Sequence, residues 1–117
     1  ESKVAVRIDD YKFITNLKPR DEDEIKAILY QNGPLSIALD ATPFQFYSEG
    51  ILDKNCNNKY LNHAVLIVGY GEDADGTKFW VIKNSWGSSW GEHGYVRLIR
   101  GKGKCGVNTY VVTAVIN

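Results

Sequence analysis

Two side chains in this 117-residue sequence, His63 and Asn84, have the types and positions expected of a proton-transfer site. His63 lies where a polar stretch gives way to an apolar run, so its imidazole is expected at a strand end near the surface. Asn84 follows a predicted strand, and its amide oxygen can accept from an imidazole N–H and hold one tautomer. The pair therefore suits a general base with an orienting partner.

These residues also have ordinary structural interpretations. A single histidine beside an apolar strand is often a hydrogen-bonded structural residue, and an asparagine that opens a loop often forms an Asx turn. Trp86 is by itself more typical of a packed aromatic than of a shield over a site. His93 lies in the stretch 91–94, which lacks apolar neighbours and is expected to be a flexible, solvated surface loop.

Other kinds of site have little support. Cys56 and Cys105 are far apart in the chain, and neither histidine has a second ligand at short spacing, so no metal site is expected. The glycine- and lysine-containing segment 101–104 does not join a strand to a helix, so no nucleotide cofactor is expected either. The two cysteines allow one disulfide or two free thiols, and their number alone does not decide between them.

The length and composition predict one globular domain over residues 1–117. Hydrophobic residues make up 44% and charged residues 24%, with 14 basic against 14 acidic side chains. A net charge of zero gives no electrostatic footprint for nucleic acid or an anionic membrane surface. The apolar stretches are far shorter than the roughly 20 residues that span a bilayer. Because the sequence opens on Glu1 and contains no methionine, we expect an excerpt or a processed product.

One main helix and about five or six strands are expected to position these side chains. Asp21 is predicted to cap a helix that ends near Asn32, where a Gly-Pro pair follows. Alternation predicts strands at residues 4–8, 35–41 and 95–100, with a loop through Tyr11 and Phe13 after the first. A probable hairpin at 63–70 and 78–83 and a β-branched run at 107–116 give the other strands. The sequence therefore predicts an α+β fold with a mostly antiparallel, barrel-like or curled sheet.

Several motifs closely resemble the papain-like cysteine proteases, a family that includes cathepsins L and F. The main ones are residues 62–71, which begin Asn62-His63-Ala64-Val65, and residues 80–95, which contain Lys83-Asn84-Ser85-Trp86-Gly87 and Trp90-Gly91-Glu92-His93-Gly94. Residues 33–37 and 105–108 match as well, so the likeness covers nearly the whole chain. The resemblance implies the C-terminal, barrel-like half of such an enzyme.

In that family the nucleophilic cysteine belongs to an N-terminal helical half. The resemblance implies that His63 is the general base and acid, pairing as imidazolium with that absent thiolate, and that Asn84 orients its ring. It also implies that Trp86 covers the His63–Asn84 hydrogen bond from water. Trp90 would pack nearby, on the side that binds substrate residues after the cut. We expect both indoles to be largely packed.

The resemblance also assigns the two cysteines. Cys56 and Cys105 do not match the nucleophile's motif and look like the family's disulfide in this half. The disulfide would close a loop of roughly 50 residues and stabilise the fold by about 4 kcal/mol. It would indicate a lysosomal or secreted protein. The implied partners are the N-terminal half of the same protease, peptide or protein substrates, and protein protease inhibitors.

Substrate selectivity in the family comes largely from an apolar pocket for the second residue before the cut. The matching positions here are Ala38, Leu61, Asn62, Ala64 and Tyr110. Tyr110 replaces a small or aliphatic residue and would shorten the pocket, which predicts a preference for medium aliphatic side chains over Arg or Trp. Asn62 stands where several members carry an acid, so the pH profile should depend less on that neighbour.

The resemblance implies a cysteine-type endopeptidase, active at mildly acidic to neutral pH as the complete protein, with no turnover from this chain alone. The alternative is an inert fragment that acts as a peptide-binding or interaction module. A third interpretation, in which the aromatic residues bind sugars or nucleic acid, requires exposed stacking platforms.

Overall fold

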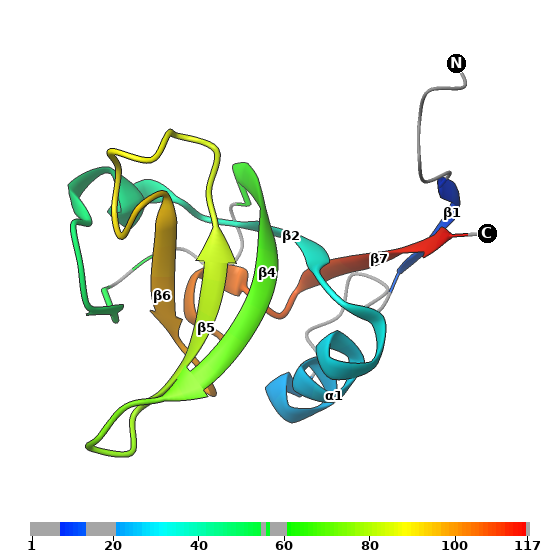
Figure 1. Ribbon diagram of the computed structural model, residues 1–117, viewed down its shortest axis with the longest axis horizontal. Helices are drawn as coiled ribbons and strands as arrows, with labels where there is room; N and C mark the ends of the chain where they lie inside the picture. The colour runs from blue at the N-terminus through cyan, green and yellow to red at the C-terminus, as the bar shows by residue number, and fades with distance from the viewer. Residues whose placement is uncertain (1–7, 14–20, 55, 57–60, 117) are drawn as a thin grey trace.

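The computed structural model describes residues 8–13, 21–54, 56 and 61–116, which form a helix and a seven-stranded sheet (Figure 1). The strands lie in the order β1-β7-β2-β4-β5-β6-β3, and all neighbours are antiparallel except β3 and β6. The predicted α+β class with a mostly antiparallel sheet is confirmed. The elements are β1 (Ile8–Phe13), α1 (Glu22–Asn32), β2 (Leu35–Leu39), η1 (Thr42–Phe46), β3 (Ile51–Leu52), β4 (His63–Glu72), β5 (Lys78–Lys83), β6 (Tyr95–Ile99), η2 (Lys104–Gly106) and β7 (Tyr110–Ile116).

Helix α1 begins and ends where local chemistry predicts. The Asp21 carboxylate accepts from the backbone N–H of Asp23 at 2.8 Å, so it caps the first turn. Gly33 follows the helix with a φ of 84°, a conformation that favours glycine, and its N–H donates to the Leu29 carbonyl. Ile25 and Leu29, one helical turn apart, are buried. Among the described residues no helix is long and apolar enough to cross a membrane.

Three strand predictions were wrong in their details. Tyr11 and Phe13 do not lie in a loop but in β1, which pairs with β7 at the other end of the chain. The last strand begins at Tyr110 rather than three residues earlier, because residues 107–109 form turns that follow η2. The two-residue β3 was not predicted at all. Val4 and Val6, which suggested a strand, lie outside the described residues.

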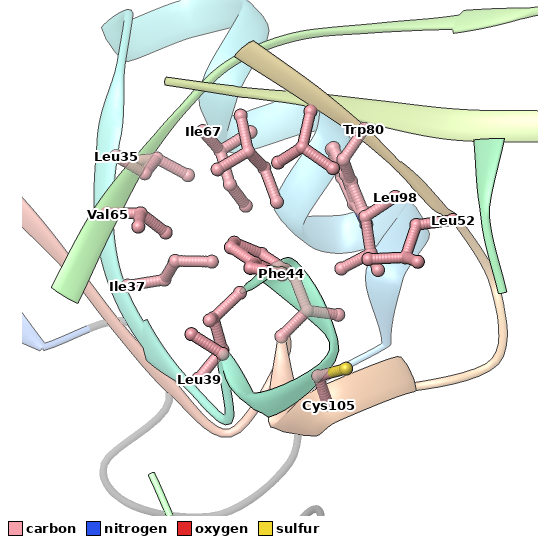
Figure 2. Packing of buried hydrophobic residues seen from close by; sticks show 14 of the residues in the cluster. Leu35, Ile37, Leu39, Phe44, Leu52, Val65, Ile67, Trp80, Leu98 and Cys105 are labelled. Atoms are coloured by element: carbon pink, nitrogen blue, oxygen red, sulfur yellow. The ribbon is translucent and has the colours of Figure 1, made fainter. Parts of the chain in front are cut away.

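The core lies on one face of β2, β4, β5 and β6 and is closed by Phe44 of η1 (Figure 2). Along β2, buried positions alternate with more exposed ones, as a strand with one covered face requires. Phe44 is fully buried at the centre of this cluster, beside Ile67 and Trp80. Each such side chain stabilises the fold by about 1.5–3 kcal/mol. The ends of β4 and β5 are thereby held on a rigid scaffold.

A buried carboxylate, Glu22, joins the start of α1 to two distant segments. Its Oε1 accepts from the Trp80 indole N–H and its Oε2 from the Gly103 backbone N–H, each at 2.6 Å. Glu22 is 6% exposed and Trp80 is fully buried, so the indole N–H would have no replacement partner if the carboxylate were lost.

We therefore expect Glu22→Gln to lower the free energy of unfolding by about 1–3 kcal/mol, because a carboxamide has only one acceptor oxygen for two donors. Urea unfolding followed by tryptophan fluorescence measures this. The exposed Glu49 provides the control, and Glu49→Gln should change stability by less than about 0.5 kcal/mol. Equal effects of the two variants would contradict the role of Glu22.

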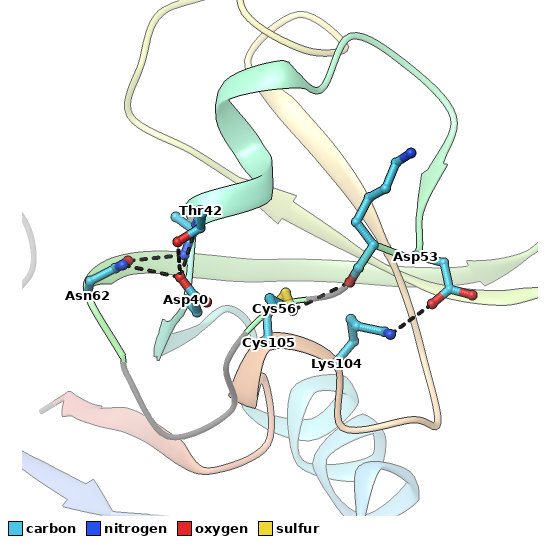
Figure 3. The surroundings of a disulfide bond; sticks show 9 residues. Asp40, Thr42, Asp53, Cys56, Asn62, Lys104 and Cys105 are labelled. Atoms are coloured by element: carbon cyan, nitrogen blue, oxygen red, sulfur yellow. Dashed lines mark hydrogen bonds and ion pairs between the residues drawn. A yellow bond between two sulfur atoms is a disulfide. The ribbon is translucent and has the colours of Figure 1, made fainter.

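The two cysteines form a disulfide, as the resemblance implied (Figure 3). Cys56 and Cys105 are 5.1 Å apart between Cα atoms and 49 residues apart in sequence. Asp53 joins the same two segments through ion pairs with Lys102 and Lys104, each at 3.1 Å. The hydrogen bond from Lys102, followed by that from Lys104, lowers the pKa of Asp53. The segment before β4 is therefore tied to η2 by a covalent bond and by charge.

Candidate active site

The structure brings His63 and Asn84 together at one end of the sheet. His63 is the first residue of β4, Asn84 follows the last residue of β5, and these two strands pair antiparallel. The imidazole Nε2–H donates to Asn84 Oδ1 at 2.7 Å, because an amide oxygen can only accept. The other ring nitrogen, Nδ1, has no hydrogen-bond partner in the part of the chain that the structure describes. The half-buried ring can therefore exchange a proton at Nδ1.

The Asn84 amide is held in one orientation. Its Oδ1 also accepts from the backbone N–H of Ser85 at 2.8 Å. The Nδ2 group is buried and has no partner among the described residues, and only 6% of the Asn84 surface is exposed. Rotating the amide would place Nδ2 against two donors, so the orientation that faces oxygen to His63 persists although it leaves a buried donor unpaired.

Trp86 lies over the imidazole of His63. The two ring centroids are 5.3 Å apart with an angle of 33° between the planes. Trp86 also contacts Trp90 edge to face at 5.3 Å, and the Trp90 indole N–H donates to the Phe44 carbonyl. Trp90 is half-buried, whereas 42% of the Trp86 surface is exposed. The expectation of a largely packed indole was therefore wrong for Trp86, whose outer face remains in solvent.

Polar groups next to His63 form a second network (Figure 3). The Asn62 side chain accepts from the Ala41 N–H at 3.0 Å and donates to Asp40 Oδ1 at 3.2 Å. The same Asp40 oxygen accepts from the backbone N–H and the hydroxyl of Thr42. Asn62 donates to the buried Asp40 carboxylate, and a carboxylate at position 62 would repel it. Residues of this network and His63 line a hollow of about 250 Å³.

Three of the five residues matched to a substrate pocket lie in one row across the sheet. Ala38 of β2 pairs with Ala64 of β4 on one side and with Tyr110 of β7 on the other. Cross-strand partners share a face, and the row lies opposite the buried side chains of the neighbouring positions. Asn62 lies beside His63 instead. Leu61, the residue before Asn62, is half-buried. Their role in binding substrate stays a prediction.

The loop that carries His93 is anchored rather than free. His93 itself is exposed, with a φ of 57°. The neighbouring Glu92, however, accepts from Arg97 Nε–H at Oε1 and from Arg97 Nη2–H at Oε2, each at 2.9 Å. Sequence reasoning missed Glu92, Arg97 and Tyr47, because their contacts join segments that are far apart in the chain. An acid inside the matched motif, next to an exposed histidine, was the only available signal.

Several pKa values around this anchor are shifted. The hydrogen bond from Arg97 holds the pKa of Glu92 below its ordinary value, against the effect of its partial burial. The same hydrogen bond raises the pKa of Arg97. Burial raises the pKa of the Tyr47 hydroxyl, opposed by its hydrogen bond to the Arg97 backbone. The Glu92–Arg97 pair therefore stays charged in mildly acidic solution.

The described residues contain no group of three His, Cys, Asp or Glu side chains that could hold a metal ion. Both cysteines are consumed in the disulfide, so this part of the chain contains no free thiol. The arrangement can accept, hold and return a proton at His63, but the chain itself brings no sulfur nucleophile to that imidazole.

Comparisons with known proteins point to one family of cysteine proteases. Residues 1–115 match the family model described as papain family cysteine protease. The chain is 50% identical to cathepsin F of Mus musculus over 84% of its length, and 47% identical to vignain of Phaseolus vulgaris over 89%. It spans 22% and 29% of those two proteins. Among solved structures, 97% of the chain superposes on 37% of digestive procathepsin L 3 of Tenebrio molitor with a TM-score of 0.86 and 41% identity.

Proposed function

Because this chain belongs to the papain family of cysteine proteases, we propose that it supplies the general base and its orienting amide to a cysteine-type endopeptidase. The observation that carries this proposal is the hydrogen bond from His63 Nε2–H to Asn84 Oδ1 at 2.7 Å, with Nδ1 left unpaired among the described residues. An imidazole held in this way presents Nδ1 in the form that accepts a proton from a thiol.

The proposed chemistry needs a sulfur nucleophile from outside this chain. His63 takes the thiol proton at Nδ1, which leaves an imidazolium beside a thiolate. The thiolate attacks the peptide carbonyl carbon, and the imidazolium returns its proton to the leaving amine when the C–N bond breaks. Water then hydrolyses the acyl-enzyme with His63 again as base. Asn84 keeps the proton on Nε2 throughout, so that only Nδ1 exchanges with the reacting groups.

The nucleophile-bearing half of the protease is the partner that this mechanism requires. Both cysteines of the chain are in a disulfide, and the chain spans only 22% of the cathepsin F that it resembles. We infer that the chain alone turns over no substrate. Peptide or protein substrates, and protein inhibitors that imitate them, are the further partners. A disulfide persists in oxidising compartments, which supports a lysosomal or secreted location.

The apolar row Ala38–Ala64–Tyr110 is the proposed wall and floor of the pocket for the second substrate residue before the cut. In the complete enzyme, we compare kcat/KM for substrates with Trp and with Leu at that position. Tyr110→Ala should raise the Trp-to-Leu ratio about tenfold, because removing the phenol ring deepens the pocket. Fluorogenic dipeptide substrates measure this ratio. Tyr30, whose surface is 81% exposed on α1, supplies the control, and Tyr30→Ala should leave the ratio unchanged. An unchanged ratio for Tyr110→Ala would remove Tyr110 from the pocket.

The decisive experiment combines the chain with a complementary nucleophile-bearing half of a papain-family protease. A thiol-reactive peptide then titrates the mixture, and a fluorogenic peptide reports turnover. The proposal requires stoichiometric labelling of the partner's thiol and turnover in the mixture, with neither half active alone. Peptide binding to the isolated chain without turnover in a correctly assembled mixture would instead support the alternative, an inert peptide-binding module.

A further inference from the structure

The loop of residues 84–95 carries both Asn84 and Trp86, and one carboxylate ties it to a different part of the chain. Glu92 Oε2 accepts from the backbone N–H of Gly50 at 2.9 Å across 42 residues of sequence, while Arg97 donates to both of its oxygens. The hydroxyl of Tyr47 donates to the Gly50 carbonyl at 2.6 Å and accepts from the Arg97 N–H at 3.3 Å. We call Glu92, Arg97, Tyr47 and Gly50 the loop clamp.

The loop clamp is connected to the imidazole by aromatic packing. The ring of Tyr47 lies 5.5 Å from that of Trp90, and Trp90 lies 5.3 Å from Trp86. Trp86 in turn lies 5.3 Å from the ring of His63. Gly91 permits this packing, since a Cβ there would come within 3.2 Å of the Tyr47 ring and 2.7 Å of the Tyr95 carbonyl. Four rings therefore form one continuous contact from the clamp to the site.

The contact with Trp90 is one of three ring contacts of Trp86 that the structure describes, the others being with Phe44 and His63. Since 42% of the Trp86 surface is exposed, its placement on His63 depends on these contacts. The loop around it has glycines at positive φ at positions 87, 91 and 94, which lower the cost of other backbone conformations. Contacts with other segments of the chain, such as that between Glu92 and Gly50, therefore help to fix the conformation of the 84–95 loop.

The ion pair with Arg97 outweighs the other groups around the clamp and favours the ionised carboxylate. Arg97 pairs with Glu92 directly, the Tyr47 hydroxyl lies beside both, and Glu49 and His93 line the same surface hollow of about 550 Å³. The pKa of Glu92 lies below its ordinary value through the hydrogen bond from Arg97. Glu92 therefore stays ionised and paired with Arg97 in the mildly acidic to neutral pH range expected for the proposed protease.

We propose that Glu92 is a positioning residue for the proposed protease: its carboxylate holds the 84–95 loop against Gly50, so that Trp86 stays stacked on His63 and keeps water from the His63–Asn84 hydrogen bond. This inference rests on the proposed function, but it adds a residue that touches neither substrate nor the reacting atoms. A solvent-exposed ion pair that lacked the aromatic packing to Trp86 would have no such effect on the site.

The test uses the complete protease, in which this chain is assembled with its nucleophile-bearing half. Glu92→Gln keeps the shape of the side chain and removes its charge, and we expect kcat to fall about tenfold with KM changed less than twofold, because a slightly displaced imidazole slows chemistry more than binding. The second readout is the proton NMR signal of the His63 Nε2–H, which should broaden through faster exchange with water. Asp53→Asn removes the ion pairs with Lys102 and Lys104, which lie outside the loop clamp, and should change neither readout.

A second variant keeps the test decisive if Glu92→Gln does not fold. Tyr47→Phe retains the ring against Trp90 and removes only the two hydroxyl hydrogen bonds, so it should lower kcat about threefold in the same direction. The inference is overturned if the folded variants behave like Asp53→Asn in both kcat and the Nε2–H signal. If His63→Ala in the same enzyme retains activity, the proposed function fails instead, so the two failures are distinguishable.

Discussion

Replacing His63 by alanine is expected to abolish peptide hydrolysis by the assembled protease, with kcat lowered by about three to four orders of magnitude. The methyl group cannot accept the thiol proton, so the nucleophile stays largely as a thiol, and no acid remains to protonate the leaving amine. The half-buried position of His63 at the start of β4 means that the core loses little, and the fold should persist. Active-site titration with a thiol-reactive peptide and initial-rate kinetics measure the loss.

The chain provides its own matched control for this substitution. His93 is the other of its two histidines and is exposed on the 84–95 loop. His93→Ala should retain turnover within about twofold, because this imidazole is outside the His63–Asn84 pair. Circular dichroism of both variants verifies that the sheet is unchanged. Comparable losses in the two variants, or residual turnover in His63→Ala close to that of the unmodified enzyme, would remove His63 from the mechanism.

Removing the disulfide should have the largest effect on stability. We expect the double variant Cys56→Ser with Cys105→Ala to lower the free energy of unfolding by about 4 kcal/mol, the loop-closure entropy of a bond between residues 49 apart. Alanine suits position 105 because the side chain there is fully buried and a hydroxyl would lack a partner. Equilibrium unfolding in guanidinium chloride under non-reducing conditions measures the difference.

Asp53 makes the control for this experiment, since its ion pairs with Lys102 and Lys104 join the same two segments without a covalent bond. Its carboxylate is exposed to solvent, so Asp53→Asn should cost less than about 1 kcal/mol. Chemical reduction of the unmodified protein should reproduce the double variant. If the double variant is no less stable than Asp53→Asn, the denatured chain must be constrained by other means and the entropic estimate fails.

Much of the local structure could be predicted from the sequence. The cap at Asp21 and the glycine at position 33 defined α1, and the apolar patterns located β2, β4 and β5 to within two residues. His63 and Asn84 were expected at strand ends, and they lie there. These features can be predicted from sequence because caps, turns and strand periodicity depend on residues within a few positions of one another.

The contacts that give the site its geometry depend on the tertiary structure alone. The register of β4 on β5 brings Asn84 to His63. The packing of the 84–95 loop decides that Trp86 stacks on the imidazole while 42% of its surface stays exposed. The bond from Gly50 to Glu92 and the pairing of β1 with β7 likewise join distant segments. Spacing along a chain specifies residue type and periodicity, whereas such contacts depend on where independent elements cross in space, which only their shared packing determines.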